Sequence, residues 1–223
     1  WGGYYAWDPV ENAALMPWLA ATAFLHSVLV QEKKNMLRVW NVVLIALTFS
    51  LTLFGTFLTR SGVINSIHSF SQSSIGDWFL GFIAVVAVGS TALILSRLSI
   101  LRTPIRFESL ASREAAFLYN NLLLVAFALT MLWGVAYPLV SEAVRGVPVT
   151  VGPPYYNFFL RIFGLPLLLL MGIGPLLAWR RASLRSFARA VAWPLLFALA
   201  VGAMLVRAGP GSSPPGLVAY TFS

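Results

Sequence analysis

The 223-residue chain has no cysteine, two histidines and few charges, which make up only 10% of its residues. An ordinary soluble domain has roughly a quarter of its residues charged. Zinc ribbons, iron–sulfur clusters, disulfide scaffolds and thiol catalysis all need cysteine and are therefore excluded. Because 59% of the residues are hydrophobic, the chain is neither disordered nor a solvated globular domain. The composition indicates an integral membrane protein.

Six apolar stretches are long enough for transmembrane helices, which need about 20 residues to cross the hydrocarbon. They lie at 10–30, 39–58, 79–96, 115–139, 158–179 and 190–206. The predicted fold class is an all-α, polytopic membrane helix bundle with about six transmembrane helices over residues 1–223.

The basic residues separate the connections into two groups. Eleven of the 15 Lys and Arg residues lie in the segments 31–38, 97–114 and 180–189. Because basic loops favour the cytoplasmic side, the other segments are expected to face outward, which in a bacterial inner membrane is the periplasm. These outer segments are 1–9, 59–78, 140–157 and the residues after Arg207. The net charge of +8 therefore indicates how the chain is oriented in the lipid membrane. We expect no nucleic-acid partner.

An aromatic segment precedes the first span. Asp8 has the features of a helix N-cap, with Pro9 at the first helical position and Glu11 completing a capping box. Aromatic faces and two glycines before this cap form a plausible platform for a planar, partly apolar ligand. An interfacial aromatic belt is the alternative. The segment reads Trp1-Gly2-Gly3-Tyr4-Tyr5-Ala6-Trp7-Asp8.

This order of residues resembles the WWD motif of the haem-handling proteins of cytochrome c biogenesis. Its continuation resembles the CcmF type of cytochrome c haem lyase subunit rather than the CcsA type. Three stretches carry that likeness: Asp8-Pro9-Val10-Glu11-Asn12 with Met16-Pro17-Trp18; Gly55-Thr56-Phe57-Leu58-Thr59-Arg60-Ser61-Gly62-Val63 with Ser66-Ile67-His68-Ser69-Phe70; and Val151-Gly152-Pro153-Pro154-Tyr155. Tyr4 and Tyr5 depart from the family in standing where Trp is frequent, although they keep an aromatic face. CcmF-type proteins are several times longer, so we expect the chain to be a fragment of a longer protein.

His26 lies inside the first span, about 27 Å along the helix from Asp8 at 1.5 Å per residue. An ionisable side chain at membrane depth is a functional candidate. A helix–helix hydrogen bond or a proton relay are the alternatives to iron ligation. The resemblance implies that His26 is one axial ligand of a structural transmembrane haem b, with its partner histidine outside this chain.

His68 and Arg60 are candidates on the outer face. The resemblance implies that His68, in the outer loop 59–78, is an axial ligand of a second haem that is the substrate. Its partner histidine would precede Trp1. Arg60 is a candidate partner for a haem propionate, or else an interfacial anchor. Asn12, one turn past Asp8, is a candidate for a hydrogen bond to a ligand or to another helix. The expected haem-binding set is Trp1, Gly2, Gly3, Tyr4, Tyr5, Trp7, Asp8, Asn12, His26, Arg60 and His68.

The resemblance implies a membrane haem lyase component. A CcmE-like haem chaperone would deliver haem to the outer face, and the thiols of apocytochrome c would add to its vinyl groups beside CcmH- and CcmI-like maturation subunits. The absence of cysteine fits thiols that come from the substrate. The alternatives are haem delivery or export without ligation, a proton-coupled transporter subunit with His26 as a relay, and a membrane scaffold that docks partners.

Overall fold

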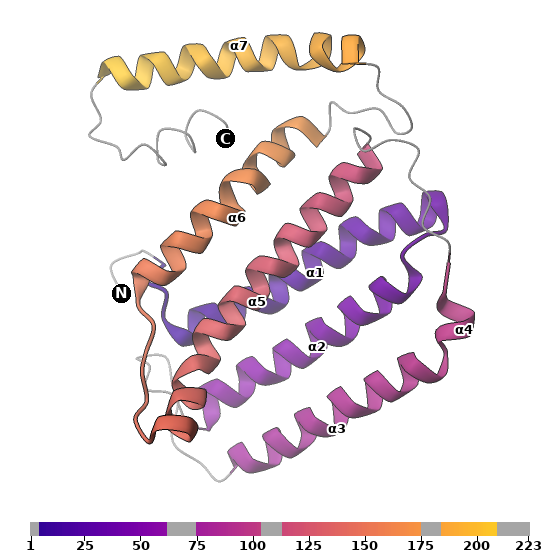
Figure 1. Cartoon of the computed structure of the whole chain (residues 1–223), viewed down its shortest axis with the longest axis vertical. Coiled ribbons are helices and arrows are strands. Elements are labelled where there is room, and N and C mark those ends of the chain that lie inside the picture. Colours follow the sequence, from indigo (N-terminus) through magenta and orange to yellow (C-terminus); the bar gives the residue numbers. More distant parts are fainter. Residues whose placement is uncertain (1–4, 62–74, 104–112, 175–183, 209–223) are drawn as a thin grey trace.

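The computed structural model describes residues 5–61, 75–103, 113–174 and 184–208. All regular elements within these ranges are helices (Figure 1). They are α1 (Pro9–Lys34), α2 (Arg38–Arg60), α3 (Ile75–Ser96), the short α4 (Leu98–Leu101), α5 (Arg113–Arg145), α6 (Pro153–Ile173) and α7 (Leu184–Ala208). The predicted all-α membrane bundle is confirmed.

Within the described residues, five helices are long and apolar enough to cross a membrane: α1, α2, α3, α5 and α6. The expected sixth span falls within α7, whose apolar stretch covers only Val191–Met204. At 1.5 Å per residue this stretch is about 21 Å long, against about 30 Å of hydrocarbon. The described part of the chain is therefore a multi-pass membrane protein with five candidate spans rather than six.

The core of the bundle lies between α1, α2 and α5. Helix α1 packs against both of the others, α3 packs on the far side of α2, and α6 packs on α5 (Figure 1). Small residues allow α1 and α2 to approach closely, because a Cβ added to Gly55 would lie 3.3 Å from the carbonyl oxygen of Ala13. Met16, Leu44, Leu58 and Met131 fill the core and are fully buried.

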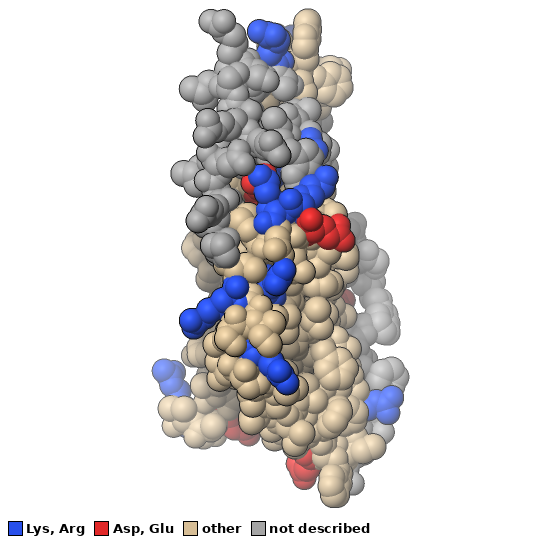
Figure 2. Space-filling view, turned by 90° about the vertical axis from the view of Figure 1, so that its right-hand side faces the viewer, with Lys and Arg blue, Asp and Glu red and all other residues tan. Residues whose placement is uncertain are grey.

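The helices alternate in direction, so their ends collect at two opposite ends of the bundle (Figure 1). Helices α1 and α6 begin, and α2 and α5 end, at the same end as the aromatic segment. Figure 2 looks onto the side where α1 ends and α2 begins, and basic side chains gather there. Six basic residues lie at or near helix termini on that side: Lys33, Lys34, Arg38, Arg97, Arg102 and Arg113.

Candidate functional site

The predicted site residues divide into two groups. Trp1, Gly2, Gly3, Tyr4 and His68 lie outside the described residues. The structure places Tyr5, Trp7, Asp8, Asn12 and Arg60 at the end of the bundle where α1 begins, and places His26 far along α1. The described residues therefore form one region at the end of the bundle and one at membrane depth.

The start of α1 has the capping box that the sequence predicts. The Asp8 carboxylate accepts from the backbone N–H of Val10 at 3.0 Å. The Glu11 carboxylate accepts from the backbone N–H of Asp8 at 3.2 Å and from that of Ala6 at 2.9 Å. These bonds satisfy donors that a helix start leaves unpaired. The two carboxylates thus fix the backbone that carries Trp7.

Trp7 is held by α6. Its indole stacks on the Tyr156 ring, with centroids 5.2 Å apart and planes 10° from parallel. Its Nε1–H donates to Oδ1 of Asn157 at 3.0 Å. A Cβ added to Gly134 of α5 would lie 2.6 Å from the Tyr156 hydroxyl oxygen, so only glycine leaves room for the buried Tyr156 ring. One face of Trp7 is therefore occupied by protein.

Asn12 is fully buried and bonds to the aromatic segment itself. Its Oδ1 accepts from the Tyr5 hydroxyl at 2.8 Å, and its Nδ2 donates to the carbonyl oxygen of Trp7 at 3.1 Å. Burial and the nearby Glu11 carboxylate raise the pKa of the Tyr5 phenol well above its ordinary value, so the phenol stays a hydrogen-bond donor. Asn12 thus ties the aromatic segment to α1.

Arg60 is exposed at the C-terminal end of α2. The last turns of α2 lie against the first turns of α1, around a small cavity of 240 Å³ that Ala13, Thr56 and Thr59 help to line. Arg60 therefore stands at the same end of the bundle as the capping box of α1.

His26 is a residue of α1 and its side chain contacts α5. Its Nδ1 is 2.5 Å from Nδ2 of Asn120, and its ring centroid is 5.6 Å from that of Phe117. Both contacts come from α5, one turn apart. The imidazole is therefore held in place by two side chains of one neighbouring helix.

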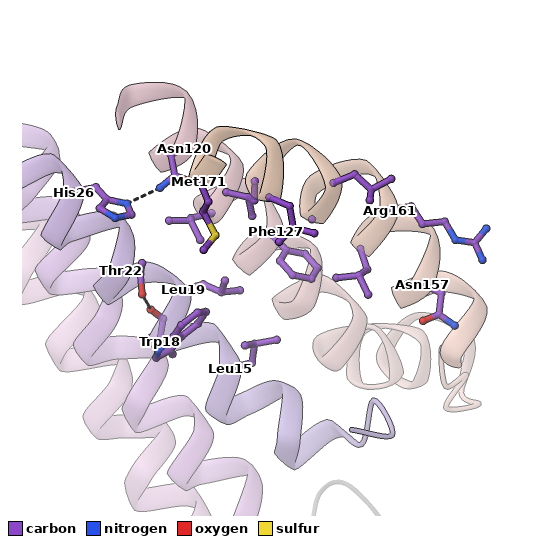
Figure 3. A pocket seen from close by; sticks show the side chains of 16 residues that line it. Leu15, Trp18, Leu19, Thr22, His26, Asn120, Phe127, Asn157, Arg161 and Met171 are labelled. Carbon is purple, nitrogen blue, oxygen red and sulfur yellow. Dashed lines mark hydrogen bonds between the residues drawn. The ribbon is translucent and has the colours of Figure 1, made fainter. Parts of the chain in front are cut away.

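A cavity of 810 Å³ joins His26 to the region around Trp7. Figure 3 shows His26 and Asn120 at one end of this cavity, with Asn157 and Arg161 at the other. Asn157, which accepts from Trp7, is thus also part of the cavity wall. The lining between the two ends is mostly apolar and comes from α1, α5 and α6, including Leu15, Trp18, Leu19, Leu124, Phe127, Leu160, Leu165, Leu167, Leu168 and Met171. A second cavity, of 390 Å³, reaches His26 beside Arg113 and Gly174.

Sequence reasoning missed Tyr156, Asn157 and Asn120. Tyr156 and Asn157 directly follow the family-like stretch that ends at Tyr155, which was a usable signal. Asn120 and Asn121 form a polar pair inside an apolar span, and buried amides in such spans need partners. Over the residues that the structure describes, no group of three or more His, Cys, Asp or Glu could hold a metal ion.

Comparison with known proteins gives one consistent family. The family described as Cytochrome C assembly protein matches residues 1–64. The cytochrome c-type biogenesis protein CycK of Rhizobium meliloti (strain 1021) is 45% identical over 221 residues, which cover 97% of this chain and 32% of that protein. The cytochrome c-type biogenesis protein CcmF of Escherichia coli (strain K12) is 42% identical over 182 residues, which cover 81% of this chain and 28% of that protein.

The fold gives the same result. A solved structure named Cytochrome c Heme Lyase CcmF is similar with a TM-score of 0.71 and 34% sequence identity, over 100% of this chain and 32% of that one. The chain thus spans about a third of the length of the relatives it matches. Sequence and fold together make the chain a member of the CcmF-type family of cytochrome c biogenesis proteins.

Proposed function

We propose that the chain is the part of a cytochrome c maturation protein that holds haem in two places. A structural haem b would be bound at membrane depth through His26. A second haem, the substrate, would rest on the outer face, against the aromatic segment 1–7 and His68, for covalent attachment to apocytochrome c. The membership of a cytochrome c biogenesis family and the position of His26 support this proposal.

The observation that carries the proposal is the environment of His26. Its imidazole belongs to the wall of an 810 Å³ cavity, within the usual size range of about 300–1,000 Å³ for ligand sites. The cavity is mostly apolar, and a neutral imidazole is a normal haem ligand. The residues present therefore fit one side of a haem, and a second ligand of its iron would come from outside this chain. When bound, haem would supply an iron that can change its oxidation state.

The end of the bundle where α1 begins offers the parts of the outer site. Tyr156, Asn157 and Asn12 hold Trp7 and Tyr5 in fixed positions. Tyr5, Ser61 and Ile75, the described residues next to segments 1–4 and 62–74, lie at this end of the bundle. Arg60 stands there as a cation for a propionate. We assign this face to the periplasm of a bacterial inner membrane, where a haem chaperone, apocytochrome c and further maturation subunits would meet it.

The first prediction concerns the two histidines. In the full-length protein purified with its haem, His26→Ala should remove or strongly weaken the b-type signal of a pyridine haemochrome spectrum, because it removes an iron ligand. His68→Ala should spare that signal and abolish binding of haem supplied to the outer face. Ser27→Ala, one residue from His26 and itself buried, is the control and should keep the spectrum of the parent. Unchanged spectra and haem binding in both histidine variants would refute both assignments.

Attachment and mere delivery of haem can be separated with the same preparation. Haem-loaded protein is mixed with its partner subunits and a reduced apocytochrome that carries a Cys-x-x-Cys-His motif. We expect haem that stays covalently bound to the cytochrome after denaturation. If no pairing of partners ever yields such a product, the protein delivers haem without attaching it.

A further inference from the structure

We propose that Asn120 is a positioning residue for His26: its side-chain oxygen accepts a hydrogen bond from Nδ1–H and so leaves Nε2 free to bind the iron. The inference rests on the proposed function, because it needs a haem at His26. It adds a role for a residue of α5 in fixing the tautomer of His26 and the potential of the iron.

Asn120 is largely buried and lies against the imidazole of His26. The amide is 8% exposed, and its Nδ2 position lies 2.5 Å from Nδ1 of His26. Phe117, one turn earlier on α5, covers the imidazole at a centroid distance of 5.6 Å. Asn120 and His26 together line the 810 Å³ cavity (Figure 3), and both also line the 390 Å³ cavity. Within the described residues, the amide of Asn120 is thus the polar side chain that contacts Nδ1 of His26.

The orientation of the amide is coupled to ligation. With Nδ2 facing Nδ1, the imidazole accepts at Nδ1 and carries its proton on Nε2, where the lone pair needed for iron is then missing. A half-turn of the amide places Oδ1 opposite Nδ1, which becomes the protonated nitrogen and leaves Nε2 able to bind a metal. The two amide orientations occupy nearly the same volume. Ligation of haem thus needs the orientation in which Asn120 accepts.

Such an acceptor changes the iron as well as the ring. A metal-bound histidine normally donates its other N–H to a carbonyl or carboxylate, which fixes the ring and makes the ligand more basic. A more basic ligand stabilises the ferric state and lowers the midpoint potential. Loss of the Asn120 oxygen should therefore raise the potential, and a carboxylate in its place should lower it.

Asn121 provides a matched control on the same helix. It is also buried and also bridges helices: its Nδ2 donates to the carbonyl oxygen of Ala23 at 2.6 Å, and its Oδ1 accepts from Nε1 of Trp40 at 2.8 Å. None of these contacts involves His26. Asn121→Leu therefore removes cross-helix hydrogen bonds of α5 without removing the acceptor for Nδ1.

The test is a redox titration of full-length, haem-loaded protein, followed by the α-band absorbance and by the electron paramagnetic resonance spectrum of the ferric haem. We expect Asn120→Leu to shift the midpoint potential upward and to change the g values. Asn120→Asp, nearly the same shape, should retain the haem and shift the potential downward. Asn121→Leu should leave the potential and the g values at those of the parent.

The inference is overturned if Asn120→Asp has the potential and spectrum of the parent, even where Asn120→Leu fails to assemble. It is also overturned if both Asn120 variants shift the potential no more than Asn121→Leu does. Failure of the proposed function would be seen in a different experiment. A haem at membrane depth that is retained in His26→Ala would show that His26 is not its ligand.

Discussion

Trp7 has a backbone conformation that tryptophan seldom adopts. Its φ is +62°, in the left-handed region, which costs an L-residue roughly 1–2 kcal/mol. The indole regains stability from its stack on Tyr156 and from the bond of its N–H to Asn157. Aromatic stacks contribute about 0.5–1.5 kcal/mol beyond the area they bury. The residue is thus held in a fixed, strained position by another helix.

The prediction at this scale concerns Asn157. Asn157→Leu should loosen the segment that carries Trp7, because it leaves a partly buried indole N–H without its acceptor, at a cost of about 1–3 kcal/mol. Hydrogen exchange of the peptide over residues 5–12, read by mass spectrometry, measures the loosening. Asn157→Asp keeps an oxygen at that position and should exchange more slowly than the leucine variant. Equal exchange in the parent and Asn157→Leu would mean that the bond does not hold the segment.

At the scale of elements, glycine sets how closely α5 and α6 approach. Gly134 faces the Tyr156 ring, and an added Cβ would lie 2.6 Å from its hydroxyl oxygen and 2.7 Å from Cε1. Tyr156 is only 2% exposed, so its ring has little room to withdraw. The approach of these two helices is what brings Tyr156 and Asn157 to Trp7.

Gly134→Ala should therefore destabilise the bundle by about 1–3 kcal/mol through overpacking. The expected result is a lower unfolding temperature in detergent and faster exchange at residues 5–12. Gly89→Ala on α3 is the control, since a Cβ there meets nothing within 4 Å, and it should not lower the unfolding temperature. An unfolding temperature for Gly134→Ala equal to that of the control would contradict the close approach.

At the scale of the whole molecule, the two ends of the bundle differ in charge. Lys33, Lys34 and Arg38 lie at one end, beside the fully buried Glu114, whose carboxylate is 3.1 Å from Nζ of Lys34. The other end carries the aromatic segment. If the basic end is cytoplasmic, the expected haem-handling end is periplasmic.

The lack of cysteine in this chain makes that orientation testable. In a full-length background free of other cysteines, Val147→Cys and Glu32→Cys place one thiol at each end, at exposed positions. A maleimide that cannot cross the membrane, applied to intact spheroplasts, should label Val147→Cys alone. Lysed cells should show labelling of both variants. Labelling of Glu32→Cys alone in intact spheroplasts would reverse the proposed topology.

Much of the architecture could be predicted from the sequence because its causes are local. Apolar length alone predicts the five spans, and the Asp8–Glu11 pair predicts the capping box at the start of α1. The sixth expected span is the exception, because the apolar part of α7 is short. Which face of each helix is buried could not be predicted. On α3, for example, Trp78 and Val85 are largely exposed although they are as apolar as the core, since lipid removes the usual contrast between buried and exposed faces.

The sequence by itself determined that this is a helical membrane protein of the CcmF type, with His26 at membrane depth and an aromatic segment before the first span. Only the tertiary structure decided what these residues touch. Trp7 and Asn157 are 150 positions apart, and His26 and Asn120 are 94 apart. Such contacts depend on the rotation and register of packed helices, which close approaches such as Gly134 on Tyr156 fix and which no local pattern of residues encodes.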